Sequence, residues 1–244
     1  MTDTLVDHEF FLCGEHSLAD PDGVLVLPGH GVIIVSDLHF EKGSSYGMGG
    51  QMVPPYDTRT TLRRLAAAIA RHRPRTVVAL GDSFHDGLAD RRMDGADAER
   101  LADLVSGVVR WVWVEGNHDP APPPQFGGEV HHAIELGSLV LRHEPTEGPA
   151  AGEIAGHLHP CAKVRGKGRS VRARCFATDG ARLIMPAFGA FTGGLNVCDP
   201  AFERCFGRAP DALVMGRSRV YPVSAKSCVP DRRQRALPSD GGLQ

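Results

Sequence analysis

Short apolar runs, the third broken only by Arg110, divide the first half of the chain. The clearest are residues 32–35, 76–80 and 108–114, and the stretches between them repeat apolar residues every three or four positions. A continuous apolar run of this length is typical of a strand covered on both faces, whereas the wider spacing is typical of an amphipathic helix. The pattern therefore predicts three buried strands joined by helices at about 57–71 and 96–106.

The second half of the chain has a different pattern. After Pro120 the apolar runs are short and closely spaced. Strands are predicted there at 129–136, 138–143, 153–157, 171–177, 182–186 and 219–223. Two further strands are predicted near the N-terminus, at 9–12 and 24–27. This order of elements indicates an α/β protein with additional short strands.

Three segments are predicted to be irregular. Residues 41–55 are rich in glycine and are interpreted as a mobile loop. Three consecutive prolines at 122–124 form a stiff connection within the domain. From about Ser227 the chain is rich in proline, arginine and glycine with little apolar content, so a disordered tail is expected over 227–244. A single domain is therefore predicted over residues 1–226.

Composition excludes several classes of protein. No apolar run reaches the length of a transmembrane helix, and the N-terminus lacks the basic and apolar regions of a signal peptide, so a cytoplasmic protein without membrane contact is expected. The net charge is −2 and the pI is about 6.6, so any contact with nucleic acid must be local. The six cysteines show no CxxC spacing, which argues against a zinc ribbon or a redox pair.

Side chains that can bind metal follow each of the three buried strands. Asp37 and His39 come after the first strand, Asp82 after the second, and Asn117 with His118 after the third. In open α/β sheets, ligands bind at the carboxyl ends of the strands. Residues two apart in an extended segment point the same way, so Asp37 and His39 are expected to lie side by side.

Two more turns of this kind occur in the second half of the chain. One contains His143, and the other contains His157 and His159 within Gly-His-Leu-His, where the two imidazoles are again two positions apart. Each block alone is weak evidence, because an aspartate after a strand is also ordinary turn chemistry. The joint occurrence of five blocks in this order is much more specific.

Together these blocks resemble the signature of the calcineurin-like metallophosphoesterases over roughly residues 30–190. The resemblance implies a β-sandwich of two mixed sheets flanked by helices, in four layers α/β/β/α. It also implies two divalent metal ions. The ligands implied for the first ion are Asp37, His39 and His159, those for the second are Asn117, His143 and His157, and Asp82 would bridge the two ions. Mixed oxygen and imidazole ligands suit Mn²⁺, Fe or Zn better than Mg²⁺ or Ca²⁺.

The resemblance extends to catalytic groups. Two ions about 4 Å apart would lower the pKa of a water between them, which would attack phosphorus. His118 would protonate the leaving oxygen or stabilise charge on the phosphoryl group, and Asp119 would orient its imidazole. His85 would either reach a phosphate oxygen or buttress the metal ligands, and Asp86 is interpreted as a turn or supporting residue.

A closer resemblance is to the ligase-associated DNA-damage-response endonucleases. It rests on four stretches, at 37–44, 54–58, 81–86 and 186–194. It implies a phosphodiesterase that uses Mn²⁺ and acts on single-stranded DNA. It also implies a role in DNA repair, in functional association with a DNA ligase, a helicase and an exonuclease.

One local feature favours a polyanionic substrate. Residues 163–174 contain six basic residues and no acidic one, beginning just after the last histidine ligand. Arg165, Lys167 and Arg169 are predicted to contact the backbone of a DNA strand, which would make binding salt-dependent. The alternative is an exposed basic hairpin without a partner.

Two other functions remain open. The first is hydrolysis of a small phosphodiester or a nucleotide pyrophosphate on the same scaffold, although no apolar insertion is long enough to hold acyl chains. The second is a metal-binding scaffold subunit without turnover. The complete ligand set and the presence of His118 argue against it.

Overall fold

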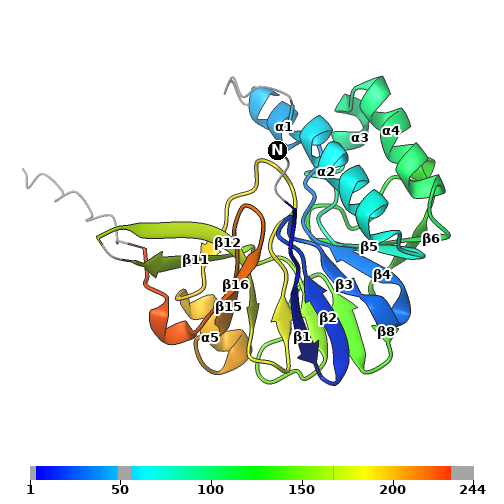
Figure 1. The fold of residues 1–244 in the computed structure, drawn as a ribbon. Helices are drawn as coiled ribbons and strands as arrows, with labels where there is room; N and C mark the ends of the chain where they lie inside the picture. The colour runs from blue at the N-terminus through cyan, green and yellow to red at the C-terminus, as the bar shows by residue number, and fades with distance from the viewer. Residues whose placement is uncertain (1–3, 49–55, 167, 232–244) are drawn as a thin grey trace, which may run out of the picture.

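Two mixed β-sheets packed face to face form the body of the protein (Figure 1). The computed structural model describes residues 4–48, 56–166 and 168–231. Within them, the first sheet follows the order β1 (His8–Leu12), β2 (Glu15–Ala19), β3 (Leu25–Leu27), β4 (Val32–Val35), β5 (Thr76–Leu80), β6 (Arg110–Val114) and β7 (Glu129–His131). β1 to β4 pair antiparallel, and β4 to β7 are parallel.

The second sheet is built mostly from the second half of the chain. Its order is β14 (Leu195–Asn196), β11 (Pro160–Arg165), β12 (Ser170–Thr178), β13 (Leu183–Ile184), β10 (Glu153–Ala155), β9 (Leu139–Arg142) and β8 (Ala133–Leu136). In addition, β15 (Asp211–Met215) pairs with β12, and β16 (Val220–Val223) pairs with β15. The strand predicted at 129–136 is thus two strands, and the chain passes from one sheet to the other at His132.

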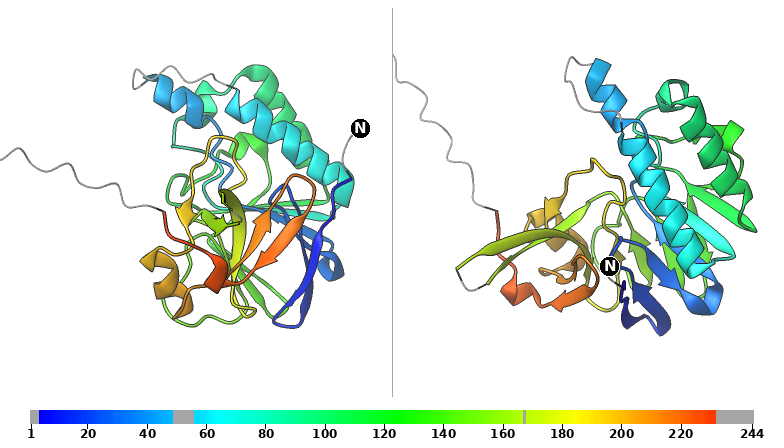
Figure 2. Two further views of the ribbon diagram at one scale, coloured as in Figure 1. Left: turned by 60° about the vertical axis from the view of Figure 1, so that its left-hand side comes forward. Right: turned by 45° about the horizontal axis from the view of Figure 1, so that its top comes forward.

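Helices cover the outer faces of both sheets. The longest are α2 (Asp57–His72) and α4 (Gly95–Ser106), which pack on the first sheet, with the short helices α1 (Lys42–Met48) and α3 (Ala89–Arg92) beside them (Figures 1 and 2). α5 (Pro200–Phe206) packs on the outer face of the second sheet. Within the described residues, three single turns of 3₁₀ helix lie at Pro28–His30, Pro124–Phe126 and Ala225–Ser227. The order helix, sheet, sheet, helix confirms the predicted α/β sandwich.

The continuous apolar runs are explained by burial on both faces of the first sheet. In β4, Val32 and Ile34 pack between the sheets, whereas Ile33 and Val35 pack beneath the helices. Each such fully buried side chain contributes about 1.5–3 kcal/mol to folding. Trp111 and Trp113 share the helix-facing side of β6, as their alternate spacing predicts, and they serve as core. The parallel register places the carboxyl ends of β4, β5 and β6 at one edge.

The glycine-rich segment after Glu41 begins as a helix, so the prediction of a loop is wrong for residues 42–48. The backbone amide of Gly43 donates to Asp57 Oδ2 (2.8 Å), and that of Glu41 donates to Thr58 Oγ1 (2.8 Å). A Cβ at position 43 would lie 2.6 Å from Asp57 Oδ1, so glycine permits this close contact. Tertiary contact with α2 overrides the low helix propensity of glycine here. Residues 49–55 lie outside the described part of the chain.

The expected disorder from Ser227 is wrong for residues 227–231. Cys228 is buried, and the backbone amide of Val229 donates to the carbonyl of Lys163 (2.8 Å). Asp231 pairs with Lys163 (3.6 Å) and Arg172 (3.2 Å). The remainder of that segment, 232–244, is outside the described residues. No helix that the structure describes is both long and apolar enough to cross a membrane.

Candidate metal centre and active site

All seven predicted metal ligands lie together at the carboxyl ends of the strands. Asp37 and His39 follow β4, Asp82 follows β5, Asn117 follows β6, His143 follows β9, and His157 and His159 follow β10. Both sheets therefore contribute to one site. Six of the seven form two groups whose ligand atoms lie within 4.8 Å of one another.

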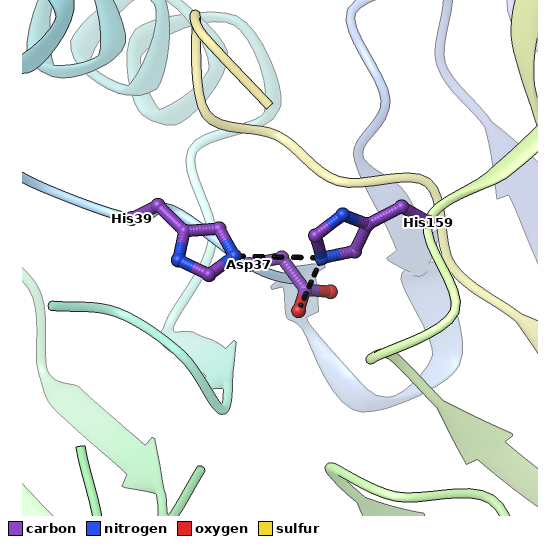
Figure 3. Close-up of side chains that lie close together, drawn as sticks. All are labelled: Asp37, His39 and His159. Carbon is purple, nitrogen blue, oxygen red and sulfur yellow. Dashed lines mark hydrogen bonds and ion pairs between the residues drawn. The ribbon is translucent and has the colours of Figure 1, made fainter. Parts of the chain in front are cut away.

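The first group is formed by Asp37, His39 and His159 (Figure 3). Asp37 Oδ1 lies 3.0 Å from His159 Nε2, which in turn lies 3.4 Å from His39 Nε2. Despite this short distance, Asp37 Oδ1 is buried without a well-aligned hydrogen-bond partner among the described residues. A buried carboxylate oxygen that faces imidazole nitrogens without a hydrogen bond is costly unless a cation binds there. The donor set fits a divalent transition metal.

The second group is formed by Asp82, His143 and His157, with Asn117 between the two imidazoles. Asn117 Oδ1 lies 3.0 Å from His143 Nε2 and 2.9 Å from His157 Nδ1. His143 Nδ1 donates to the carbonyl of Leu80 (3.2 Å), which leaves its Nε2 for a metal ion. The amide oxygen of Asn117 completes the set without adding negative charge.

Asp82 lies between the two groups. Its Oδ2 is 3.3 Å from His143 Nε2 and 3.9 Å from His39 Nε2, and its Oδ1 accepts a hydrogen bond from the backbone amide of His118 (2.9 Å). Because the side chain faces a ligand of each group, it is in the position that a bridging carboxylate requires.

Five of the seven candidate ligands have a positive φ angle, which is uncommon for residues other than glycine. The left-handed region, which costs about 1–3 kcal/mol for a residue other than glycine, is a frequent feature of functional sites. It is occupied by Asp37 (φ 53°), His39 (φ 45°), Asp82 (φ 46°), His157 (φ 66°) and His159 (φ 47°). Asp37 and His39 meet in the first group, whereas His157 and His159 belong to different groups. The expected extended backbone is wrong for both pairs, because sharp turns carry these residues.

Glycines before the ligands leave no room for a side chain. A Cβ on Gly81, which has φ 73°, would lie 2.2 Å from His143 Nδ1. A Cβ on Gly156 would lie 2.1 Å from Ser36 Oγ and 2.7 Å from Asp37 Oδ2. The Gly-Asp and Gly-His blocks of the sequence therefore reflect close packing of backbone against the ligands.

Burial and charge prepare the ligands for a metal. Burial lowers the pKa of His39 to about 3, so its imidazole is neutral at pH 7. Burial opposes ionisation of Asp82, but the hydrogen bond and charge of His143 outweigh it and lower the pKa of that carboxyl. Burial likewise disfavours the His143 cation, yet the hydrogen bond to Asp82 and the charge of Asp37 raise its pKa to about 9. His143 must lose this proton to bind metal, so metal affinity should rise with pH up to about 9.

His118 lies beside the first group, but Asp119 does not orient it as predicted. His118 Nδ1 donates instead to the carbonyl of His85 (2.9 Å), which leaves Nε2 for a substrate. Asp119 Oδ2 accepts from the backbone amides of Ser83 (2.9 Å) and Phe84 (3.0 Å) and so fixes the turn that carries Asp82. Burial raises the pKa of Asp119 to about 7.

His85 packs against two other histidines. Its ring stacks on His118 with centroids 5.3 Å apart and meets the edge of His39 at 5.5 Å. Its Nδ1 is buried without a hydrogen-bond partner in the described part of the chain. Both predicted roles, contact with phosphate and support of the ligands, stay predictions. Asp86 is a turn residue as expected, and it pairs with both terminal nitrogens of Arg92 (2.9 and 2.7 Å).

Three residues near the site were not predicted. Ser36 Oγ donates to Asp37 Oδ2 (2.5 Å) and lies 3.1 Å from the carbonyl of Leu80, so it holds the Asp37 carboxylate. Lys42 and Tyr46 extend toward the site from α1, which the sequence analysis predicted to be a loop. Burial lowers the pKa of Lys42 while the Asp37 and Asp82 carboxylates oppose the shift. The Tyr46 ring, 40% exposed, lies 6.2 Å from that of His85.

The basic segment forms a hairpin of β11 and β12 that projects from the body (Figures 1 and 2). Three of its six basic residues are engaged within the protein. Lys163 and Arg172 pair with Asp231, and Arg174 donates to the carbonyls of Ala187, Gly189 and Thr192. Arg165 and Arg169 are exposed at the tip, about 20 Å from His159 by strand rise, and Lys167 lies outside the described residues.

Comparison with known proteins agrees with this geometry. The sequence model of the calcineurin-like phosphoesterases matches residues 30–165. The crystal structure of the nuclease MPE of Pseudomonas putida matches with a TM-score of 0.70 and 28% identity, over 89% of this chain and all of that chain. No curated protein matched the chain.

Two other solved structures resemble it less. The phosphoesterase Yfce of E. coli has a TM-score of 0.39 and 16% identity, over 80% of this chain and 98% of that one. A protein of unknown function from Aquifex aeolicus has a TM-score of 0.36 and 18% identity, over 52% of this chain and 78% of that one. The family match covers more than half of the sequence and includes every predicted metal ligand, so the chain belongs to the calcineurin-like phosphoesterase family.

Proposed function

We propose that this protein is a Mn²⁺-dependent endonuclease that hydrolyses phosphodiester bonds in single-stranded DNA. The observation that carries the proposal is the position of Asp82 between two complete ligand groups, which suits two ions acting on one phosphate. The similarity to a nuclease at 28% identity along the whole length of that protein supports a diester substrate.

The metal ligands, the groups that hold them and His118 have different roles in the proposed reaction. Two divalent ions would supply a nucleophile at neutral pH and neutralise charge on the phosphoryl group. The protein holds their ligands through Ser36, the Leu80 carbonyl and the strained turns. His118 is fixed through Nδ1, so its Nε2 can donate a proton to the leaving oxygen or a hydrogen bond to a phosphoryl oxygen. Mixed oxygen and imidazole ligands suit Mn²⁺, Fe or Zn, and the resemblance to the DNA-damage-response endonucleases favours Mn²⁺ among them.

Single-stranded DNA is the polyanion that best suits the exposed residues around the candidate metal centre. Asn117 and His118 are exposed, so the centre opens to the surface and can admit a chain in mid-strand. Tyr46 offers an exposed aromatic ring beside His85, and bases stack on such rings regardless of sequence. We further propose, from the resemblance alone, a role in DNA repair in association with a DNA ligase, a helicase and an exonuclease.

The hairpin tip is proposed to bind the strand away from the centre. Replacing Arg165, Lys167 and Arg169 with alanine should weaken binding of single-stranded DNA by about tenfold and reduce the salt dependence of log Kd by about 2, as expected for three lost phosphate contacts. Fluorescence anisotropy between 50 and 200 mM salt measures both quantities.

A matched control removes the same charge elsewhere on the surface, by replacing the exposed Arg208, Arg217 and Arg219 with alanine. The control should leave Kd and its salt dependence unchanged. If the hairpin variant loses hydrolysis of a small chromogenic diester as much as it loses DNA cleavage, the proposed contact with the strand is wrong.

The function is tested by incubating the protein and Mn²⁺ with circular single-stranded DNA, beside duplex DNA and a chromogenic phosphodiester. Linear products from the circles would establish internal cleavage, because an exonuclease needs an end. Cleavage of the small ester with intact circles would indicate a small-molecule phosphodiesterase or pyrophosphatase instead. Absence of turnover on all three by protein shown to contain two ions would indicate a scaffold.

A further inference from the structure

A cavity of about 460 Å³ adjoins the second metal group. Its wall includes the ligands Asn117 and His143, so a molecule within it would lie next to a phosphate held at the centre. Pockets that bind small organic ligands commonly have volumes of about 300–1,000 Å³. The size therefore suits one nucleobase with its sugar.

A buried ion pair between Glu153 and Arg182 holds one wall of the cavity in place. Glu153, 4% exposed, accepts from Arg182 (2.6 Å) and from Thr146 Oγ1 (2.8 Å), and Thr146 lines the cavity. Arg142, also in the wall, has its Nε 3.6 Å from Glu153 Oε2 and buried without a well-aligned partner in the described chain. The cavity is thus formed before any ligand enters.

The charged residues that line the cavity determine which kind of ligand it can bind. Glu115 and Glu144 bring two carboxylates, and Arg142 brings one guanidinium. Glu115 is tied to His132 at the rim (3.3 Å). A second phosphate would be repelled by the two carboxylates, whereas a neutral ring with an exocyclic amino group beside a ring-nitrogen or carbonyl acceptor matches carboxylates and guanidinium together. The prolines at 120 and 145 add apolar surface for such a ring.

We propose that this cavity binds the nucleobase adjacent to the bond that is cut, and that it gives the enzyme a base preference at one position. This inference rests on the proposed nuclease function. The carboxylates accept hydrogen bonds from the exocyclic amino groups of cytosine, adenine and guanine, which thymine lacks. One flanking position should therefore favour the amino-bearing bases over thymine by about tenfold.

The first test is cleavage of a random-sequence single-stranded library, with the new ends sequenced. The wild-type protein should show the preference at one fixed position from the cut. Glu144→Gln keeps the size of the side chain but replaces half of its acceptor capacity with a donor, so it should flatten the preference. Glu135→Gln, the same change at an exposed site on β8 outside this cavity, should keep it. Cuts without base preference, or an unchanged Glu144→Gln profile, would overturn the inference.

The second test does not depend on DNA cleavage. Deoxycytidine monophosphate should inhibit hydrolysis of the chromogenic diester with a constant about tenfold lower than that of deoxyribose 5-phosphate, and Glu144→Gln should reduce this ratio. If DNA is not cut but this discrimination is present, the nuclease proposal fails and the base site stands. If DNA is cut and neither test shows discrimination, only the base site fails.

Discussion

Replacement of Asp82 with asparagine is expected to lower phosphodiester hydrolysis by about a thousandfold or more. The Asp82 carboxylate, which we propose as the bridge, faces ligands of both groups, so its loss would remove charge from both ion sites at once. The contribution of metal ions to a transition state is several kcal/mol, and about 1.4 kcal/mol corresponds to each factor of ten in rate. Steady-state kinetics at saturating Mn²⁺ measure the loss, and elemental analysis should show fewer than two bound ions.

The matched control is Asp103→Asn, the same change on the exposed side of α4. It should retain both ions and full activity. Asparagine at 82 also keeps the acceptor for the His118 amide, so the fold should persist with an unchanged circular dichroism spectrum. Retention of two ions and of activity within tenfold of wild type would show that Asp82 is not the bridge.

Replacement of Arg182 with methionine is expected to cost about 3–5 kcal/mol of the free energy of unfolding. Arg182 is 1% exposed, donates twice to Glu153 (2.9 and 2.6 Å), and also binds the carbonyls of Thr146, Gly148 and Cys205. Removing one partner of a buried pair leaves the other charge without compensation. In a chain of this size the melting temperature should fall by about 10 °C, which calorimetry measures.

Two comparisons isolate the cause of this loss. Arg204→Met removes an arginine whose pair with Glu147 is long (3.8 Å) and exposed, so it should cost less than about 1 kcal/mol. Adding Glu153→Gln to Arg182→Met should recover part of the stability, because no charge then stays buried alone. Equal losses in the two arginine variants would contradict this account.

The sequence predicted β4, β5 and β6 of the first sheet well, because burial on both faces produces almost unbroken apolar runs. It missed β2, β11, β14, β15, α3 and α5, whose residues mix polar and apolar side chains. It also missed α1, because two glycines weaken its helical pattern and its support comes from Asp57 and Thr58 on another helix. Contacts between two helices of this kind produce no hydrophobic periodicity in the sequence, so they cannot be predicted from it.

The grouping of the candidate metal ligands was predictable for a different reason. Each ligand block combines a glycine or a strand end with residue types that bind metal, and five such blocks in order leave few alternatives. The neighbours of the ligands were not predictable in this way. The partner of His118 is a backbone carbonyl, which has no sequence signature, and Arg174 faces inward although it belongs to a basic run. Whether a charged residue faces solvent depends on tertiary structure.

The left-handed turns beneath the ligands bear on any attempt to move this centre into another protein. Aspartate, asparagine and histidine enter that backbone region more readily than most residues other than glycine, and aspartate and histidine are also metal ligands. At positions 37, 39, 82, 157 and 159 one choice of residue therefore satisfies both the metal and the chain. A designer who grafted only the side chains onto regular strands would lose the angles at which they meet, so the turns are the part that must be copied first.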